Sequence, residues 1–516
     1  MIDIVRFVLR LARILRLSQG DGAMVIGLTY SPRGVGVSSV VGCLPARTRD
    51  LAASLCLAGW VFAAPAAFAQ TAPECVEEPS WGTAPSLRLP GDVCGGGSGP
   101  HNTKFFLLSW RIFKFLVWPA APGQRGVPDE QKKITDVDAL HPRTFETFKP
   151  DWEILRAGAA VPIEWNEYPS VAAPCTNLPK IDPRTPVLAS FDKFGSLPAL
   201  NQVLVAQNRT YARYQPAFNK TVFDKIKDQR LFNANVVGGI RDLKPNEPAS
   251  PVTKQDDGAL TIKSAWIELP EGSTHFDRSR FYIREKAWVQ DLDGSCKKAT
   301  VALVGLHFVY KTPSRPQWIW STFEHVDNVP DNPRGNLNGS ERNFVFNNGD
   351  VRQRMKDRAP QEYRIPPHLG DPPPAYQVER LQRIKREVLD ANEKWQTDLR
   401  TLGSVWQFYK LVMTQWPTIP IRPELDAFSA IPDPFCNERN KTASVNTTME
   451  TFLQTQQGCH RERTCMGCHN NARTTDFIFS IPLNPYRPPE EMINPDPRAK
   501  AIKALQEVLH KSGSGK

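Results

Sequence analysis

The residues with the most specific chemistry are five consecutive ones near the end of the chain, Cys465-Met466-Gly467-Cys468-His469. Two cysteines three positions apart, followed at once by a histidine, form the attachment sequence for a c-type haem. Cys465 and Cys468 can each form a thioether bond with a vinyl group of the same porphyrin. His469 can then ligate the iron from one face as the proximal ligand. The sequence therefore predicts one covalently bound haem c.

The elements expected around this pentapeptide resemble those of a small cytochrome c domain. We expect a helix over Thr447–Gln457 capped by Asn446, then the pentapeptide, a proline-rich loop over Pro482–Pro497 and a last helix around Arg498–His510. The resemblance implies that the sixth iron ligand is a methionine in the loop, where Met492 lies only 23 residues after His469. A thioether ligand would raise the reduction potential and close the iron to other ligands.

Other side chains compete with Met492 for the sixth position, and an empty position would open the iron to small ligands. The competitors are Met449, His460, His510, His307 and His325. Two other readings of the pentapeptide are weaker. A zinc site would use Cys459, Cys465, Cys468 and His469. A thioredoxin-like redox pair lacks the strand-then-helix context that such a pair requires.

An export signal is predicted near the start of the chain. Arg47 and Arg49 precede an apolar run over 51–69 that closes on Ala67-Phe68-Ala69, a small-x-small cleavage site. We therefore expect residues 1–69 to be removed and the protein to be periplasmic or secreted. Because signals normally begin at the initiator, we expect the true start to lie downstream of about residue 40. Alternatives are an arginine-rich surface helix at the N-terminus and a lipoprotein box ending at Cys43.

Export changes what the cysteines and charges imply. Of ten cysteines, eight remain after cleavage and six remain beyond the haem pair, an even number in a compartment where disulfides persist. Sequence alone permits 15 pairings of six cysteines. Local proximity favours Cys75–Cys94, and a Cys436–Cys459 bond would brace the approach to the haem. Residues 1–69 carry seven Lys and Arg and three Asp and Glu, so the mature chain has a net charge of +6. This charge would suit an acidic redox partner. The chain lacks a basic cluster interleaved with aromatic residues, which a nucleic-acid-binding protein would show.

The expected fold class is α+β. Residues 70–435 are predicted to form a large sheet-rich domain of unknown role, and 436–516 a small, mostly helical haem domain. Strands are expected over Leu260–Leu269, Phe281–Gln290, Ala299–Lys311 and Ser404–Trp416. Helices are expected over Phe105–Trp118, which Pro119 ends, and along the amphipathic stretch from Val378 to Leu399. No mature segment is long and apolar enough to span a bilayer.

The stretch Val304–Asn328 holds the candidate catalytic residues. Glu324, His325 and Asp327 offer an acid–base group near Trp318 and Trp320. His307 lies on a predicted strand. In an enzymatic interpretation, His325 is a distal proton shuttle and Trp320 an electron relay beside the haem. In a structural interpretation, the same residues form a buried, hydrogen-bonded corner after a strand.

Here the chain resembles a set of exported bacterial proteins of about this size, described as cytochrome c family proteins. The segments that carry the resemblance are Val304–Asn328, Ser109-Trp110, Trp118-Pro119, 125–129 and the haem motif. The resemblance implies one long protein type without an assigned reaction. The leading expectation is an exported monohaem cytochrome for one-electron transfer. A haem peroxidase, oxidase or oxygenase, and a docking or sensor module with a haem electron port, are the alternatives.

Overall fold

The computed structural model describes parts of the chain: 29–31, 34–36, 81–94 except 86, 103–136, 141–170, 173–175, 185–190, 204–236, 255–291, 295–331, 343–348, 375–380, 383–417, 438–439, 446–451, 465, 469 and 475–483. Contacts divide the chain into two compact units, Met1–Ala69 and Gln70–Lys516. In the first, β1 (Thr29–Ser31) pairs antiparallel with β2 (Gly34–Gly36). The predicted export signal lies outside the described residues.

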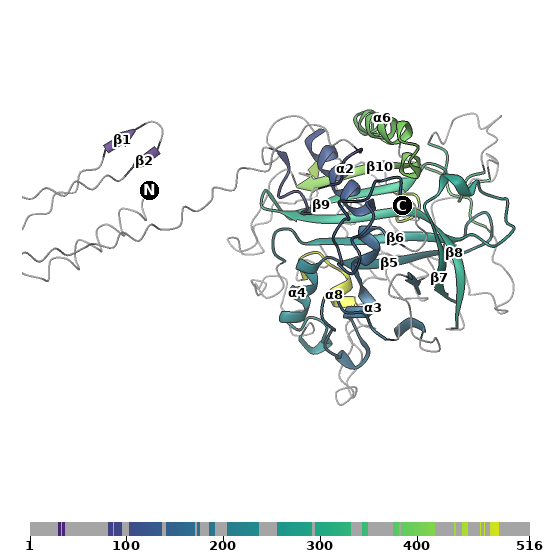
Figure 1. Cartoon of the computed structure of the whole chain (residues 1–516), viewed down its shortest axis with the longest axis horizontal. Coiled ribbons are helices and arrows are strands. Elements are labelled where there is room, and N and C mark those ends of the chain that lie inside the picture. The colour runs from purple at the N-terminus through teal and green to yellow at the C-terminus, as the bar shows by residue number, and fades with distance from the viewer. Residues whose placement is uncertain are drawn as a thin grey trace, which may run out of the picture. The chain divides into compact units, whose positions relative to one another are not determined.

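The second unit is built around one sheet, whose long strands run across Figure 1. The main strand order is β11-β10-β9-β8-β6-β5-β3, and β7 pairs with β8 and β4. Every pairing is antiparallel except β4 with β7. The strands are β3 (Lys149–Pro150), β4 (Val187–Leu188), β5 (Ala212–Phe218), β6 (Leu260–Glu268), β7 (Ile283–Gln290), β8 (Cys296–Thr312), β9 (Arg315–His325), β10 (Tyr409–Pro417) and β11 (Glu438–Arg439). The unit is a sheet-rich α+β structure, as the sequence predicts.

The helices are few, and most of them are short. Two are long, α2 (Thr103–Val117) and α6 (Arg386–Thr401). The shorter ones are α3 (Asp151–Ile154), α4 (Lys220–Asp228) and α8 (Ser480–Leu483). Single 3₁₀ turns are η2 (Thr144–Thr147), η3 (Ala157–Ala159), η4 (Ala173–Cys175), η7 (Arg278–Arg280) and η8 (Val405–Phe408). Among the described residues, no helix has both the length and the apolar character needed to cross a bilayer.

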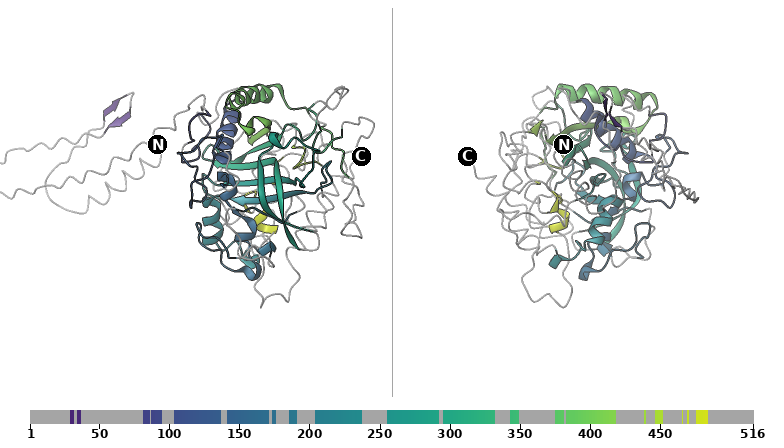
Figure 2. Two further views of the ribbon diagram at one scale, coloured as in Figure 1. Left: turned by 45° about the vertical axis from the view of Figure 1, so that its right-hand side comes forward. Right: turned by 90° about the vertical axis from the view of Figure 1, so that its left-hand side faces the viewer.

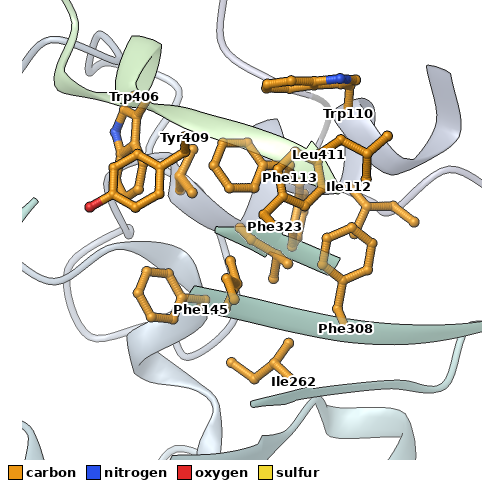
Figure 3. Close-up of a cluster of buried hydrophobic side chains, with 14 of the residues drawn as sticks. Trp110, Ile112, Phe113, Phe145, Ile262, Phe308, Phe323, Trp406, Tyr409 and Leu411 are labelled. Atoms are coloured by element: carbon orange, nitrogen blue, oxygen red, sulfur yellow. The ribbon is translucent and has the colours of Figure 1, made fainter. Parts of the chain in front are cut away.

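Helix α2 is the centre of an aromatic core on one face of the sheet. Because α2 is apolar on almost every side, it must be buried nearly all round. Phe113 stacks on Phe323 of β9 with ring centroids 4.2 Å apart, and Trp110 stacks on Trp395 of α6 at 5.5 Å. Figure 3 shows Phe113 and Phe323 with Trp406 and Tyr409 in the same cluster. Pro119 follows the last turn, which confirms the predicted end of this helix.

Strand β9 separates this core from the C-terminal segments. Side chains alternate between the two faces of a strand. Ser321 accepts or donates a 2.8 Å hydrogen bond with Ser109 of α2, and Phe323 also faces α2. Thr322, between them, faces the other side, where its hydroxyl accepts from the Asn446 amide at 2.9 Å. Figure 2 shows the yellow α8 and the blue α2 on different sides of the teal strands.

Two predicted elements begin later than expected. The helix expected from Val378 starts at Arg386, because Val378 donates its N–H to Phe346 O at 2.7 Å and so belongs to an extended segment. The strand expected from Ser404 starts at Tyr409, after η8. Most of the described apolar positions of both patterns are buried, so the patterns located core residues but misplaced the element boundaries.

The segment before the haem motif also differs from expectation. Asn446 caps the backbone as predicted, since its Oδ1 accepts from the N–H groups of Thr448 and Met449 at 2.9 and 3.2 Å. However, 446–451 form turns rather than the first part of a helix. The rest of that predicted helix, like the final one around Arg498–His510, lies outside the described residues.

One disulfide links distant parts of the second unit. Cys175 and Cys296 are bonded across a sequence separation of 121 residues. Cys94 is also disulfide-bonded. Cys75 and the predicted pair Cys436–Cys459 lie outside the described residues. The six cysteines beyond the haem pair therefore include at least three that form disulfides.

Candidate haem-attachment site

His469 is oriented by a hydrogen bond to the backbone. Its Nδ1 lies 2.7 Å from the carbonyl oxygen of Phe477. A carbonyl oxygen can only accept, so Nδ1 carries the hydrogen and Nε2 of the neutral ring carries the lone pair. Metal-ligating histidines almost always donate their other ring N–H to a carbonyl, carboxylate or water. His469 therefore has the tautomer that an iron ligand through Nε2 requires.

The surroundings of His469 are aromatic and apolar. Its ring centroid lies 4.5 Å from that of Trp320 and 4.9 Å from that of Phe479. Cys465, four residues earlier and also helical, is half-buried against the hydrophobic clusters. Cys465 and His469 thus share an apolar environment, which would suit a porphyrin.

The carbonyl oxygen of Phe477, which accepts the hydrogen bond from His469, belongs to a turn with unusual backbone angles. Asp476 and Phe477 have φ angles of 50° and 67°, a left-handed conformation that costs non-glycine residues about 1 kcal/mol or more each. Such conformations persist only where the surroundings determine them. Here Asp476 Oδ2 accepts from Lys311 Nζ at 2.6 Å and from the Gln255 N–H at 2.8 Å.

Two buried polar groups beside this turn have no hydrogen-bond partner within the described part of the chain. One is the side-chain amide of Gln255, through both its nitrogen and its oxygen, and the other is the indole N–H of Trp318. Gln255 and Trp318 are fully buried. Buried polar groups are normally paired with protein, water or ligand. These groups fit a bound molecule that has polar as well as apolar surface, as a porphyrin with carboxylate substituents does.

His325 lies away from His469. It is fully buried, its Nε2 donates to Arg280 O at 2.9 Å and its Nδ1 accepts from the Asp327 N–H at 3.1 Å. Burial lowers the pKa of His325 to about 4. By the alternation of β9, His325 faces the side opposite to Trp320. The structure therefore does not bring this predicted proton shuttle to the haem motif, and its contacts match the structural interpretation.

Glu324 faces the same side of β9 as Trp320 and is the centre of a buried charge network. Its carboxylate forms an ion pair with Arg380 and lies 3.5 Å from Lys410 Nζ. Its other oxygen accepts from the Thr447 N–H at 3.0 Å and from the Thr447 hydroxyl at 2.9 Å. Glu324 thus fixes the start of the C-terminal segment on the sheet.

His307 and Met449 also lie on this face. His307 Nε2 is 3.4 Å from a carboxylate oxygen of Glu450. On β8 and β9, His307 is paired with Thr322, two residue pairs from the pair of Val309 with Trp320. Met449 is buried in a different hydrophobic cluster from Trp320. Of the predicted residues, His307 therefore lies on the face that carries Trp320, and Met449 packs as a core residue.

Several predicted site residues lie outside the described residues: Cys468, Met492, His460, His510 and Cys459. Within the described ranges, no group of three or more His, Cys, Asp or Glu side chains is arranged to hold a metal ion. Sequence reasoning missed Lys311, Asp476 and Phe477, since a lysine in a strand and a Thr-Asp-Phe sequence carry no recognisable signal. No protein-family model, curated protein or solved structure matches this chain.

Proposed function

We propose that this protein is a monohaem c-type cytochrome that transfers one electron at a time. Cys465 and Cys468 would anchor haem c, and His469 would be the proximal iron ligand. The observation that carries the proposal is the 2.7 Å hydrogen bond between His469 Nδ1 and Phe477 O. It gives the histidine of the attachment motif the tautomer and the fixed ring orientation of a metal ligand.

The bound haem would supply a one-electron couple, and the protein side chains would set its environment. Trp320 and Phe479 both contact the His469 ring. The buried apolar residues around Trp318 and Ile481 exclude water, and burial is one of the factors by which a protein sets a haem potential. We propose Met492 as the distal ligand, which would close the iron to small molecules.

The proposed location is the periplasm or the extracellular space. The Cys175–Cys296 disulfide supports it, because structural disulfides form and persist in oxidising compartments. We propose that residues 436–516 are the haem-carrying part. Its described residues contact the sheet through Asn446, Thr447 and Asp476. An acidic redox protein would be the partner that the positive mature chain favours.

A haem enzyme is the second candidate, and one observation favours it. The half-buried pair of His307 and Glu450, 3.4 Å apart, offers an acid–base group on the face that carries Trp320. Glu324 and His325, in contrast, are fully engaged in buried contacts.

Mass spectrometry of the exported full-length chain tests the proposal. The wild type should carry the added mass of one haem, and Cys468→Ala should lose one thioether linkage. Cys175→Ser, a cysteine outside the motif, should keep the full haem mass and serves as the control. A mature wild type without added mass would refute the cytochrome.

Absorption spectra with and without carbon monoxide separate the two candidates. A six-coordinate, low-spin iron that ignores carbon monoxide indicates electron transfer with a protein distal ligand. Rapid binding of carbon monoxide would remove Met492 as a stable ligand and favour the enzyme.

A further inference from the structure

One buried ion pair connects the sheet to the turn that holds His469. Lys311 Nζ on β8 is 2.6 Å from Asp476 Oδ2, and their side chains are 0 % and 4 % exposed. The same ammonium group lies 5.6 Å from the centre of the Trp318 ring. Lys311 is separated from Asp476 by 165 residues of sequence, so this contact is a long-range feature of the fold.

We propose that the Lys311–Asp476 pair positions the proximal histidine. The pair fixes Asp476, the left-handed turn fixes the Phe477 carbonyl, and that carbonyl fixes the Nδ1–H of His469. Lys311 is thus a positioning residue of the proposed haem site, which acts on His469 through Asp476. The consequence for the haem rests on the proposed function, whereas the effect on the His469 tautomer does not.

The geometry favours a positioning role over a contribution to stability alone. Buried ion pairs contribute little net stability, because removing both charges from water costs about as much as their attraction returns. The Lys311–Asp476 pair, however, adjoins two consecutive non-glycine residues with positive φ. Asp476 Oδ2 also accepts the Gln255 N–H, so Lys311 and the backbone converge on one oxygen. The pair thereby maintains a conformation that the turn would not adopt by itself.

The orientation of this carbonyl would also affect the bound iron. A proximal histidine that donates Nδ1–H to a fixed acceptor is a more basic ligand. A more basic ligand stabilises the oxidised iron. Loosening the turn should therefore raise the reduction potential, without changing any atom bonded to the iron.

Lys311→Met in the full-length chain tests the proposal, with two companions. Lys311→Arg keeps the positive charge and should restore the wild-type tautomer ratio and reduction potential. Lys149→Met is the matched control, because Lys149 is also fully buried, pairs with Glu153 at 3.2 Å and lies 5.3 Å from an aromatic ring. Both methionine variants lose a buried lysine beside a carboxylate, but Lys149 has no described contact with residues 475–478.

The first readout is the tautomer of His469 by ¹⁵N NMR in the haem-free full-length protein, assigned with His469→Gln. The Nδ1–H form should predominate in the wild type and in Lys149→Met. In Lys311→Met its ratio to the Nε2–H form should fall about fivefold, the change expected for loss of one typical hydrogen bond. An unchanged ratio in Lys311→Met, together with destabilisation equal to that of Lys149→Met, would overturn the proposal.

The second readout is the reduction potential of the haem-loaded protein. It should rise in Lys311→Met and return to the wild-type value in Lys311→Arg. A potential that is unchanged in Lys311→Met, or that shifts equally in Lys149→Met, would contradict the proposed role. A wild type that carries no haem would refute the cytochrome and leave the tautomer measurement to decide the role of Lys311.

Discussion

Replacing Glu324 separates a structural role from a catalytic one. Both Glu324 and its partner Arg380 have fully buried side chains. Glu324→Gln removes the negative charge from Arg380 and from Lys410. The neutral amide can accept from Thr447 or face Arg380, but it cannot satisfy both. Removing one member of an isolated buried ion pair typically costs about 3–5 kcal/mol, and Asp331, which also pairs with Arg380 and Lys410, compensates part of that loss here.

That loss is large compared with the 5–15 kcal/mol by which domains are usually stable. We therefore expect the midpoint of urea unfolding of Glu324→Gln to fall markedly. Glu164→Gln is the control, because Glu164 pairs with Lys227 but is 70 % exposed, and such pairs contribute at most about 1 kcal/mol. Adding Arg380→Met to Glu324→Gln should recover part of the loss, with a coupling energy of about 2 kcal/mol.

Two results would refute this reasoning. One is a Glu324→Gln protein whose free energy of unfolding stays within about 1 kcal/mol of wild type. The other is additivity of the two substitutions, which would mean that Glu324 and Arg380 do not act as a pair. A stable Glu324→Gln variant that loses a haem-dependent reaction would favour the catalytic interpretation instead.

Two further predictions concern stability. Burial lowers the pKa of His325 from 6.5 to about 4. The unfolded chain therefore gains a proton before the folded one, and the free energy of unfolding should fall by about 3 kcal/mol between pH 6.5 and pH 4. His325→Gln should lack this part of the pH dependence, and an identical pH profile would contradict the assignment. The Cys175–Cys296 bond spans 121 residues. The free energy of unfolding of the double serine variant should therefore be about 4–5 kcal/mol lower than that of the oxidised wild type. Denaturant titration without reductant checks this, and a difference below about 1 kcal/mol would contradict it.

Much of the sheet could be predicted because its signals are local. The three predicted strands between Leu260 and Lys311 correspond to β6, β7 and β8, since alternating β-branched and aromatic residues report their own burial. The start of α6 could not be predicted. Residues from Val378 onward show helical spacing, but backbone pairing with Phe346 keeps the first of them extended. Such pairing depends on residues far away in the sequence.

The same distinction applies to the candidate site. The pentapeptide is recognisable because haem attachment requires adjacent residues at fixed spacing. The residues that surround the site of His469 are not recognisable, because Lys311 and Trp320 come from strands that end more than 140 residues before it. The sequence could also have shown that Glu324 and His325 do not act as one cluster. Neighbours on a strand point to opposite faces, so only one of the two could face the haem motif.

The size of the protein is the remaining question, because a small electron carrier does not need a sheet of this extent. The contacts suggest an answer. Strand β9 provides Trp320 beside the His469 ring, and Glu324 on the same face binds the segment at Thr447. Strand β8 provides Lys311, which fixes the turn at Asp476. Three side chains of one sheet face thus hold the C-terminal segment at separate points. In our proposal, the sheet replaces the internal packing by which a small cytochrome domain orients its own proximal histidine. The haem environment would then depend on residues that no haem motif contains.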